Sequence, residues 1–372
     1  MYSERRKKMG ERKVRKKKNI ALRVIAGILI ALVLVVGIYF LYVFRTYHRI
    51  ADKQNLDVTK GSTAEACAVG KEYNVISYNI GFGAYTPDFS FFMDGGKSSW
   101  AESKESVIET VTGAAELVRS LDPEIVMFQE IDTNGTRSYH VDQKKLIDGI
   151  LPEYTNVFAV NYDSPFLMYP LTQPHGKNQA GIGTYTKFDI TSALRRSLPI
   201  SESLSKLVDL DRCYSVSRIP VENGKELVVI NVHLSAYGNS DAIREGQKNM
   251  LKEEMAAEIA AGNYLIVGGD FNHDLIAPED QTDVAGWAYP YPRSYLPEGV
   301  HFCLDALSQE ELSALKPTCR NANEPYDPAT SEQFVIDGII ISDNIEQISY
   351  HTVENEYLYS DHNPVELVFR LK

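Results

Sequence analysis

A run of 21 uncharged, mostly apolar residues near the N-terminus constrains this chain more than any other feature. The run covers 24–44, and at about 1.5 Å per residue a helix of this length spans roughly 30 Å, the thickness of a bilayer's hydrocarbon core. Its length and aromatic C-terminal end favour an uncleaved anchor over a signal peptide, whose apolar region has only about 7–15 residues. No polar face interrupts the run, which argues against a buried core helix. We therefore predict a transmembrane helix over 24–44.

The charges before this helix predict its orientation. The first 45 residues carry twelve Lys and Arg against two acidic residues, a sum of +10, and most of them precede the helix. The positive-inside rule then places 1–23 in the cytoplasm as a basic tail and everything after the helix outside. The polar segment 45–71 is predicted to be a juxtamembrane stalk, reaching roughly 90 Å if extended, and 72–372 to be the folded domain. The sequence thus predicts a single-pass protein of the cell membrane with an extracytoplasmic C-terminal domain.

The remainder of the chain is strongly acidic. Beyond the first 45 residues there are 26 basic and 48 acidic residues, a sum of −22. A protein that binds a nucleic-acid duplex normally neutralises several phosphates with a basic face. This charge therefore weighs against polymeric nucleic acid as the main ligand.

Four cysteines lie in a predicted compartment that permits disulfides, and none forms a CxxC pair. Cys303 and Cys319 are close in sequence and are the favoured pair. Spacing does not determine connectivity, however, and all four thiols being free remains an alternative for Cys67, Cys213, Cys303 and Cys319.

The folded region reads as strands interrupted by a few helices. Helical periodicity covers 103–120 and 241–261. Early alternation of strand and helix, followed by several strands in succession, predicts an α/β protein of the α+β type with layered mixed sheets. The predicted strands are apolar runs bounded by turn residues, at 73–80, 124–129, 155–160, 181–186, 213–221, 227–234, 264–268, 334–341, 348–353 and 365–371.

Three connections rich in aromatic residues and proline, 86–100, 163–178 and 285–299, are predicted to be loops. Such loops most often pack against their own domain. Together they could instead surround a pocket or touch the bilayer.

Polar side chains follow nearly every predicted strand. Carboxylates and amides predominate among them and thiolates are missing, which suits Mg²⁺ or Mn²⁺ better than Zn²⁺. Such a cation neutralises a phosphate while a carboxylate accepts a proton from water and a histidine stabilises the phosphoryl oxygens. The chemistry indicated is phosphate-ester hydrolysis. In chain order these residues are Asn79, Glu130, His233, Asp270, Asn272, Asp337, Asp361 and His362.

The order and the amino-acid sequences of these segments resemble those of the endonuclease/exonuclease/phosphatase superfamily, which includes nucleases, inositol-polyphosphate phosphatases and neutral sphingomyelinases. The resemblance covers 73–371, and six motifs in the family's order make it specific although each alone is weak. It implies a four-layer sandwich of two mixed β-sheets flanked by helices, here preceded by the transmembrane helix. The motifs are SYNIG with Asn79, FQEID with Glu130, NVHL with His233, GGDFN with Asp270 and Asn272, VIDGIIIS with Asp337, and SDHNPV with Asp361 and His362.

The resemblance also implies a role for each acidic and amide residue. Glu130 would be the main metal ligand, with Asn79 and Asp361 completing its oxygen shell. Asp270 would orient or deprotonate the attacking water. Asn272 would hold the phosphate or position Asp270.

For the histidines, the resemblance implies contacts with phosphate. His362 would hydrogen-bond the scissile phosphate, held in its tautomer by Asp337, although a purely structural hydrogen bond is nearly as good a reading of Asp337. His233 would bind a second phosphate oxygen, as in the phosphodiesterase branches of the family.

Candidate substrate contacts lie in two polar segments. Tyr139 and Arg137 follow Glu130 where some relatives place a phosphate-contacting tyrosine. Asn178 belongs to a polar loop with His175 and Lys177.

Together these features predict a membrane-anchored, extracytoplasmic, Mg²⁺- or Mn²⁺-dependent phosphodiesterase. A phospholipid or small phosphodiester is favoured over nucleic acid as substrate, and no protein partner is inferred. One alternative is a nuclease on the outer face, separated only by its substrate. Another is a non-enzymatic binding module on the same fold, which would be expected to have lost Glu130, Asp270 or His362.

Overall fold

The computed structural model describes residues 1–62, 66–207, 209–236, 241–280 and 287–372. It divides the chain into two compact units, Met1–His48 and Arg49–Lys372. Residues 285–286 of the third predicted loop lie outside the described residues.

The first unit is essentially one helix, α1 (Tyr2–Thr46), whose side chains are nearly all exposed. It is long and apolar enough to cross a membrane, which is compatible with the predicted anchor. The helix begins well before the predicted span because the Lys, Arg and Glu residues of the basic tail are themselves good helix formers.

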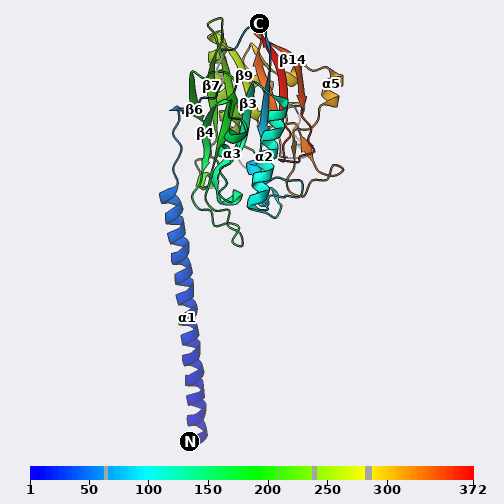
Figure 1. Ribbon diagram of the computed structural model, residues 1–372. Helices are drawn as coiled ribbons and strands as arrows, with labels where there is room; N and C mark the ends of the chain where they lie inside the picture. Colours follow the sequence, from blue (N-terminus) through cyan, green and yellow to red (C-terminus); the bar gives the residue numbers. More distant parts are fainter. Residues whose placement is uncertain (63–65, 208, 237–240, 281–286) are drawn as a thin grey trace. The chain divides into compact units, whose positions relative to one another are not determined.

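The second unit is built on two mixed β-sheets (Figure 1). In spatial order, the larger sheet contains β1 (Gln54–Asn55), β6 (Ser192–Ser197), β7 (Cys213–Pro220), β8 (Glu226–His233), β9 (Tyr264–Asp270), β13 (Asp337–Ser342) and β10 (Val300–Phe302). The other contains β14 (Ile345–Thr352), β15 (Val365–Leu371), β2 (Glu72–Asn79), β3 (Ile125–Gly135), β5 (Asn178–Thr186) and β4 (Thr155–Asp163). A short ribbon pairs β11 (Cys319–Arg320) with β12 (Gln333–Phe334).

Each sheet has one parallel pair at its centre, β2 with β3 and β8 with β9. Parallel neighbours need a crossover connection, and helices α2 (Lys104–Leu121) and α4 (Asp241–Ala260) lie within these two connections. Helix α3 (Gln143–Ile150) packs beside α2 and against β3. Helix α5 (Gln309–Ala314) is held at its start by a capping box from Ser308.

Short 3₁₀ helices occupy some of the connections. Those in the described residues are η1 (Gly81–Gly83), η2 (Phe92–Asp94), η3 (Thr136–Ser138), η4 (Leu204–Leu207), η5 (Arg293–Tyr295) and η6 (Cys303–Ala306).

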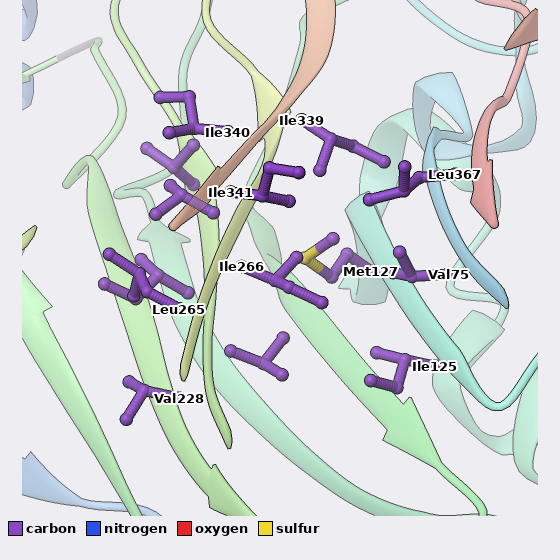
Figure 2. Packing of buried hydrophobic residues seen from close by; sticks show 14 of the residues in the cluster. Val75, Ile125, Met127, Val228, Leu265, Ile266, Ile339, Ile340, Ile341 and Leu367 are labelled. Atoms are coloured by element: carbon purple, nitrogen blue, oxygen red, sulfur yellow. The ribbon is translucent and has the colours of Figure 1, made fainter. Parts of the chain in front are cut away.

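The main core lies between the two sheets. Figure 2 shows Ile125 and Met127 of β3 near Ile266 of β9, and all three side chains are fully buried. The glycine at 268 permits this close approach, because a Cβ there would meet Met127 Cε at 2.3 Å. A second cluster packs α2 and α3 on the outer face of the β2–β3 sheet. The predicted sandwich of mixed sheets with flanking helices is confirmed.

The strand predictions also hold, with one difference in detail. The run predicted over 334–341 divides into β12 and β13, because Val335 and Ile336 cross from one pairing to the other. The sequence did not indicate the short strands β1, β6, β10 and β11, which are too brief or too polar to show a period of two.

Of the predicted stalk 45–71, the described residues 49–62 and 66–71 belong to the folded unit. Strand β1 pairs with β6, and Thr59 and Asn156 exchange two backbone hydrogen bonds of 2.8 Å. Cys67 is fully buried in the main core. The segment looked like a stalk because edge pairing of this kind needs no apolar periodicity.

All four cysteines are buried and free. The favoured pairing of Cys303 with Cys319 is therefore wrong, and the alternative of four free thiols is what the structure has.

Candidate active site

The topology brings the predicted site residues to one edge of the two sheets. Asn79 and His233 end the parallel strands β2 and β8, and Asp270 ends β9. Asp270 lies directly opposite His233 on one side and Asp337 on the other in the strand register. The carboxyl ends of parallel strands share an edge, so residues far apart in sequence converge there.

Asp270 is the centre of the cluster. Its Oδ1 accepts the backbone N–H of Asn272 at 2.8 Å, and its Oδ2 accepts the side-chain amide of Asn79 at 3.1 Å. His233 Nε2 lies 3.4 Å from the same Oδ2. Burial, followed by repulsion from the Asp337 carboxylate, raises the pKa of Asp270 to about 7. At neutral pH this carboxyl group can therefore both hold and release a proton.

His362 is fixed by Asp337. Its Nδ1 donates to Asp337 Oδ2 at 2.7 Å, which leaves Nε2 facing the cluster, 3.9 Å from Asp270 Oδ2. Burial alone would lower the pKa of His362, but the Asp337 carboxylate outweighs it and the net shift is well upward. The second oxygen of Asp337, Oδ1, is buried without a partner. This arrangement holds a cationic N–H donor at the site.

His233 differs in charge from His362 although the two lie close together. Burial, reinforced by the positive charge of Arg212, lowers the pKa of His233 well below its usual value. Its Nε2 points between Asp270 and Glu130, at 3.4 and 3.9 Å. His233 is therefore a neutral imidazole beside a cationic one.

Glu130 occupies a strained backbone position. Its φ is 56°, in the left-handed region that non-glycine residues avoid, and it lies where the pairing of β3 with β5 shifts register. The bulge turns the Glu130 carboxylate out of the sheet and into the site. Strain of this kind in an acidic residue at a bulge within a strand is typical of a functional position.

The cavity wall offers a donor set that suits a hard divalent cation. Glu130 and Asp361 line it together with Asp270, and burial raises the pKa of Asp361 to about 6, to which repulsion from Glu130 contributes. Ligand atoms of Asp361 and His362 also lie within 4.8 Å of Cys319 Sγ. Carboxylate oxygens that repel one another in a buried site are those a cation would stabilise.

Asn79 lies beside two carboxylates of the site, Glu130 and Asp270. Its Oδ1 accepts the N–H of Gly81 at 3.0 Å, while its amide nitrogen donates to Glu130 at 3.3 Å and to Asp270. The oxygen predicted to bind metal thus accepts one backbone N–H and keeps a second lone pair, and its contact with a metal stays a prediction. In this arrangement Asn79 positions the two carboxylates.

These residues surround a cavity of about 390 Å³. Glu130, His233, Asp270, Asn272, Asp361 and His362 line it, and Arg137 does so as well. Arg137 is held by two hydrogen bonds to Asp132, of 3.1 and 2.8 Å, and stacks 3.7 Å from the Phe82 ring centroid.

Tyr139 and Asn178 are not among the residues that line the cavity. The Tyr139 hydroxyl donates to the carbonyl of Glu102 at 3.1 Å. Asn178 is fully buried, accepts the Arg137 N–H and donates to the His175 carbonyl. Both side chains support neighbouring loops, and their contact with substrate stays a prediction.

Several cavity residues carried no signal in the sequence. Arg212, Arg320, Tyr162 and Asp209 line the cavity but lie outside the six motifs. Asn231 of β8 joins the two sheets: its side chain accepts from Gln129 at 2.8 Å and donates to two backbone carbonyls. Only the three-dimensional packing identifies these residues.

A second cavity of about 300 Å³ adjoins the first and has an apolar lining. The two share Met93, Tyr162 and His175. Tyr169 and Leu171, on the loop that borders the second cavity, expose 71% and 79% of their surface. The predicted aromatic loops 86–100 and 163–178 therefore do surround a pocket.

The fold and the cavity define a two-sheet α+β protein with an acidic, histidine-containing hydrolase-type site. The model of the Endonuclease/Exonuclease/phosphatase family matches residues 76–362. The chain belongs to this family, whose members are generally phosphoester hydrolases and commonly use divalent metal ions. Among curated proteins none matches significantly.

Solved structures show the same fold at low identity. An endonuclease/exonuclease/phosphatase from Beutenbergia cavernae is 16% identical with a TM-score of 0.56, covering 81% of this chain and 72% of its own. One from Bacteroides vulgatus is 16% identical with a TM-score of 0.52, covering 81% and 100%. TDP2 from D. rerio, solved in complex with a single strand DNA product, is 14% identical with a TM-score of 0.53, covering 81% and 99%.

Proposed function

We propose that this protein is a membrane-anchored, extracytoplasmic, divalent-cation-dependent phosphodiesterase that hydrolyses a phospholipid or a small phosphodiester. The observation that carries the proposal is the convergence of Glu130, Asp270 and His362 on one cavity. Retention of all three argues against a non-enzymatic binding module.

The proposed reaction is in-line attack of water on phosphorus. Mg²⁺ or Mn²⁺, held by Glu130 and Asp361, would neutralise the phosphate charge. Asp270 accepts the proton of the attacking water, as its pKa of about 7 allows near neutrality. His362 Nε2 donates to a phosphoryl oxygen, and Asp337 keeps the ring in the required tautomer. The departing oxygen takes up a proton from solvent, giving a phosphomonoester and an alcohol.

Two observations support a lipid or small substrate. The acidic sum of −22 beyond residue 45 opposes a long polyanion. The apolar second cavity and the exposed Tyr169 and Leu171 offer a surface for hydrocarbon beside the catalytic groups. The helix α1 supports a location at a bilayer, and the basic residues before its apolar run support an extracytoplasmic domain.

A nuclease activity is the second candidate. It is favoured by the likeness to TDP2, whose structure holds a single strand DNA product. The catalytic residues would be the same, so the substrate alone distinguishes the two functions.

Hydrolysis of bis-p-nitrophenyl phosphate by the full chain in detergent tests the reaction. We expect turnover with Mg²⁺ or Mn²⁺, none with EDTA, and loss in Glu130→Ala and His362→Ala. Glu109→Gln, an exposed change on α2, serves as the control and should retain activity. Absence of metal-dependent turnover in a folded chain would refute the phosphodiesterase.

The substrate class is tested by competing the surrogate with phospholipid vesicles, nucleotides and single-stranded DNA. Cleavage of DNA in preference to phospholipids and small diesters would make the nuclease the correct function.

A further inference from the structure

Three arginines line the active-site cavity, and they differ in what holds them. Arg137 forms its paired hydrogen bonds with Asp132. Arg320 donates to backbone carbonyls, among them Thr86 at 3.0 Å, although its Nε is unpartnered. Arg212 makes no side-chain hydrogen bond or ion pair with any residue that the structure describes, and its Nε and Nη1 are buried without partners.

The position of Arg212 is fixed by the backbone. It immediately precedes β7, and the Leu198 N–H donates to its carbonyl at 2.9 Å. Because β7 pairs antiparallel with β8 and Tyr214 lies opposite Val232, Arg212 enters the sheet beside the end of β8, where His233 lies. The side chain lines the cavity with only 7% of its surface exposed.

A buried guanidinium without a counter-charge is costly, since desolvation is not offset by an ion pair or hydrogen bonds. The acidic residues of the cavity do not supply that counter-charge. Within the described part of the chain, no carboxylate oxygen lies within the 4.0 Å of an ion pair from the Arg212 nitrogens. An anion that entered the cavity would supply the missing partner.

We propose that Arg212 is a substrate-binding residue that pairs with an anionic phosphoryl oxygen. The inference rests on the proposed function in that the natural anion is a phosphoester. A guanidinium is suited to this contact because its planar fork matches phosphate oxygens and it stays charged at any working pH. The binding role extends beyond the residues of the six motifs, none of which includes Arg212.

Binding of inorganic phosphate to the full chain in detergent tests the inference without requiring turnover. Affinity is measured by calorimetry at fixed Mg²⁺, and thermal unfolding is followed with and without phosphate. We expect Arg212→Gln to weaken phosphate binding by about 10- to 100-fold, the range for hydrogen bonds to charged groups. Arg212→Lys, which keeps the charge but not the fork, should lose less.

The control is Arg218→Gln, in strand β7, which Arg212 immediately precedes. Arg218 is ion-paired with Glu226 and Glu258 and is not among the residues that line the cavity, so its phosphate affinity should equal that of the wild type. Without phosphate, Arg212→Gln should unfold no earlier than the wild type, because it removes a buried charge that lacks a partner.

The inference is overturned if Arg212→Gln binds phosphate as the wild type does, or if the wild type binds none. It is also overturned if Arg212→Gln lowers the phosphate-free unfolding temperature while Arg212→Lys restores stability but not affinity, since the role would then be structural. Arg212-dependent phosphate binding without diester hydrolysis would refute the proposed function and leave this inference intact. If the wild type hydrolysed the diester and Arg212→Gln bound phosphate normally, this inference would be refuted and the proposed function would stand.

Discussion

Glu130 allows backbone strain to be separated from chemistry by comparing two substitutions, Glu130→Gly and Glu130→Ala. Both remove the carboxylate and its hydrogen bond from Asn79. They differ only in a Cβ at a backbone φ of 56°. A left-handed conformation costs an L-residue about 1–2 kcal/mol, and glycine loses about 0.5–1 kcal/mol through its greater freedom when unfolded. We therefore expect Glu130→Gly to be the more stable variant, by about 0.5–1 kcal/mol.

The assay is urea unfolding of both variants in EDTA, with stability differences taken from the transition midpoints at a common slope. The matched control is the same pair of substitutions at Glu109, in the middle of helix α2. There glycine should be less stable than alanine by about 1 kcal/mol, so the sign reverses between the two positions. Neither Glu130 variant should show metal-dependent turnover. If Glu130→Ala were as stable as Glu130→Gly while the Glu109 pair behaved as expected, the strain argument would be refuted.

Three further predictions follow from other contacts. Asp337→Asn should reduce turnover of bis-p-nitrophenyl phosphate by about 100-fold or more with little change in KM, because the hydrogen bond that orients His362 is lost. A normal rate would show that the contact is only structural. A fragment covering 72–372 should be at least about 4 kcal/mol less stable to urea than one covering 49–372, because four or more backbone hydrogen bonds from the deleted segment are lost. Equal urea midpoints would show that the deleted segment is a stalk that does not stabilise the domain. Burial lowers the pKa of His175 to about 3. The stability contributed by its neutral form is therefore complete above pH 6.5 and is lost as the pH falls, by up to about 1.4 kcal/mol per pH unit. In His175→Gln the urea midpoint should change less between pH 6.5 and 5 than in the wild type, and parallel plots of midpoint against pH for the two proteins would contradict this.

Much of the fold could be predicted because it obeys simple rules of periodicity. The strands that form the sheet centres are continuous apolar runs such as β8 and β9, since they are buried on both faces. Edge elements were less visible. Strand β6 is rich in polar residues, and Arg195 within it is buried only because its guanidinium finds backbone carbonyls. No local sequence pattern predicts that backbone carbonyls will accept hydrogen bonds from a buried arginine.

The site could be predicted as a set of residues but not as a set of contacts. The motifs name Asp270, Asp337 and His362, and strand order brings them together. The amide of Asn79, by contrast, could face the metal or the carboxylates on sequence grounds. Its orientation depends on the backbone N–H of Gly81, two residues away in a turn. A role that depends on which atom already forms a hydrogen bond cannot be predicted from the sequence and requires the structure.

Several departures from ordinary folding rules lie among the residues that line the active-site cavity. Glu130 and Asn272 both have left-handed backbones without being glycine. Asp270 is buried next to other acids, and Arg212 is buried without a counter-charge. Each of these would be selected against if stability alone mattered, because each raises the free energy of the folded state. A phosphate and a cation bound together would offset the charge costs, since the anion would pair with Arg212 and the cation with the carboxylates. Under the proposed function, the cavity would therefore be complementary to a metal-bound phosphoester.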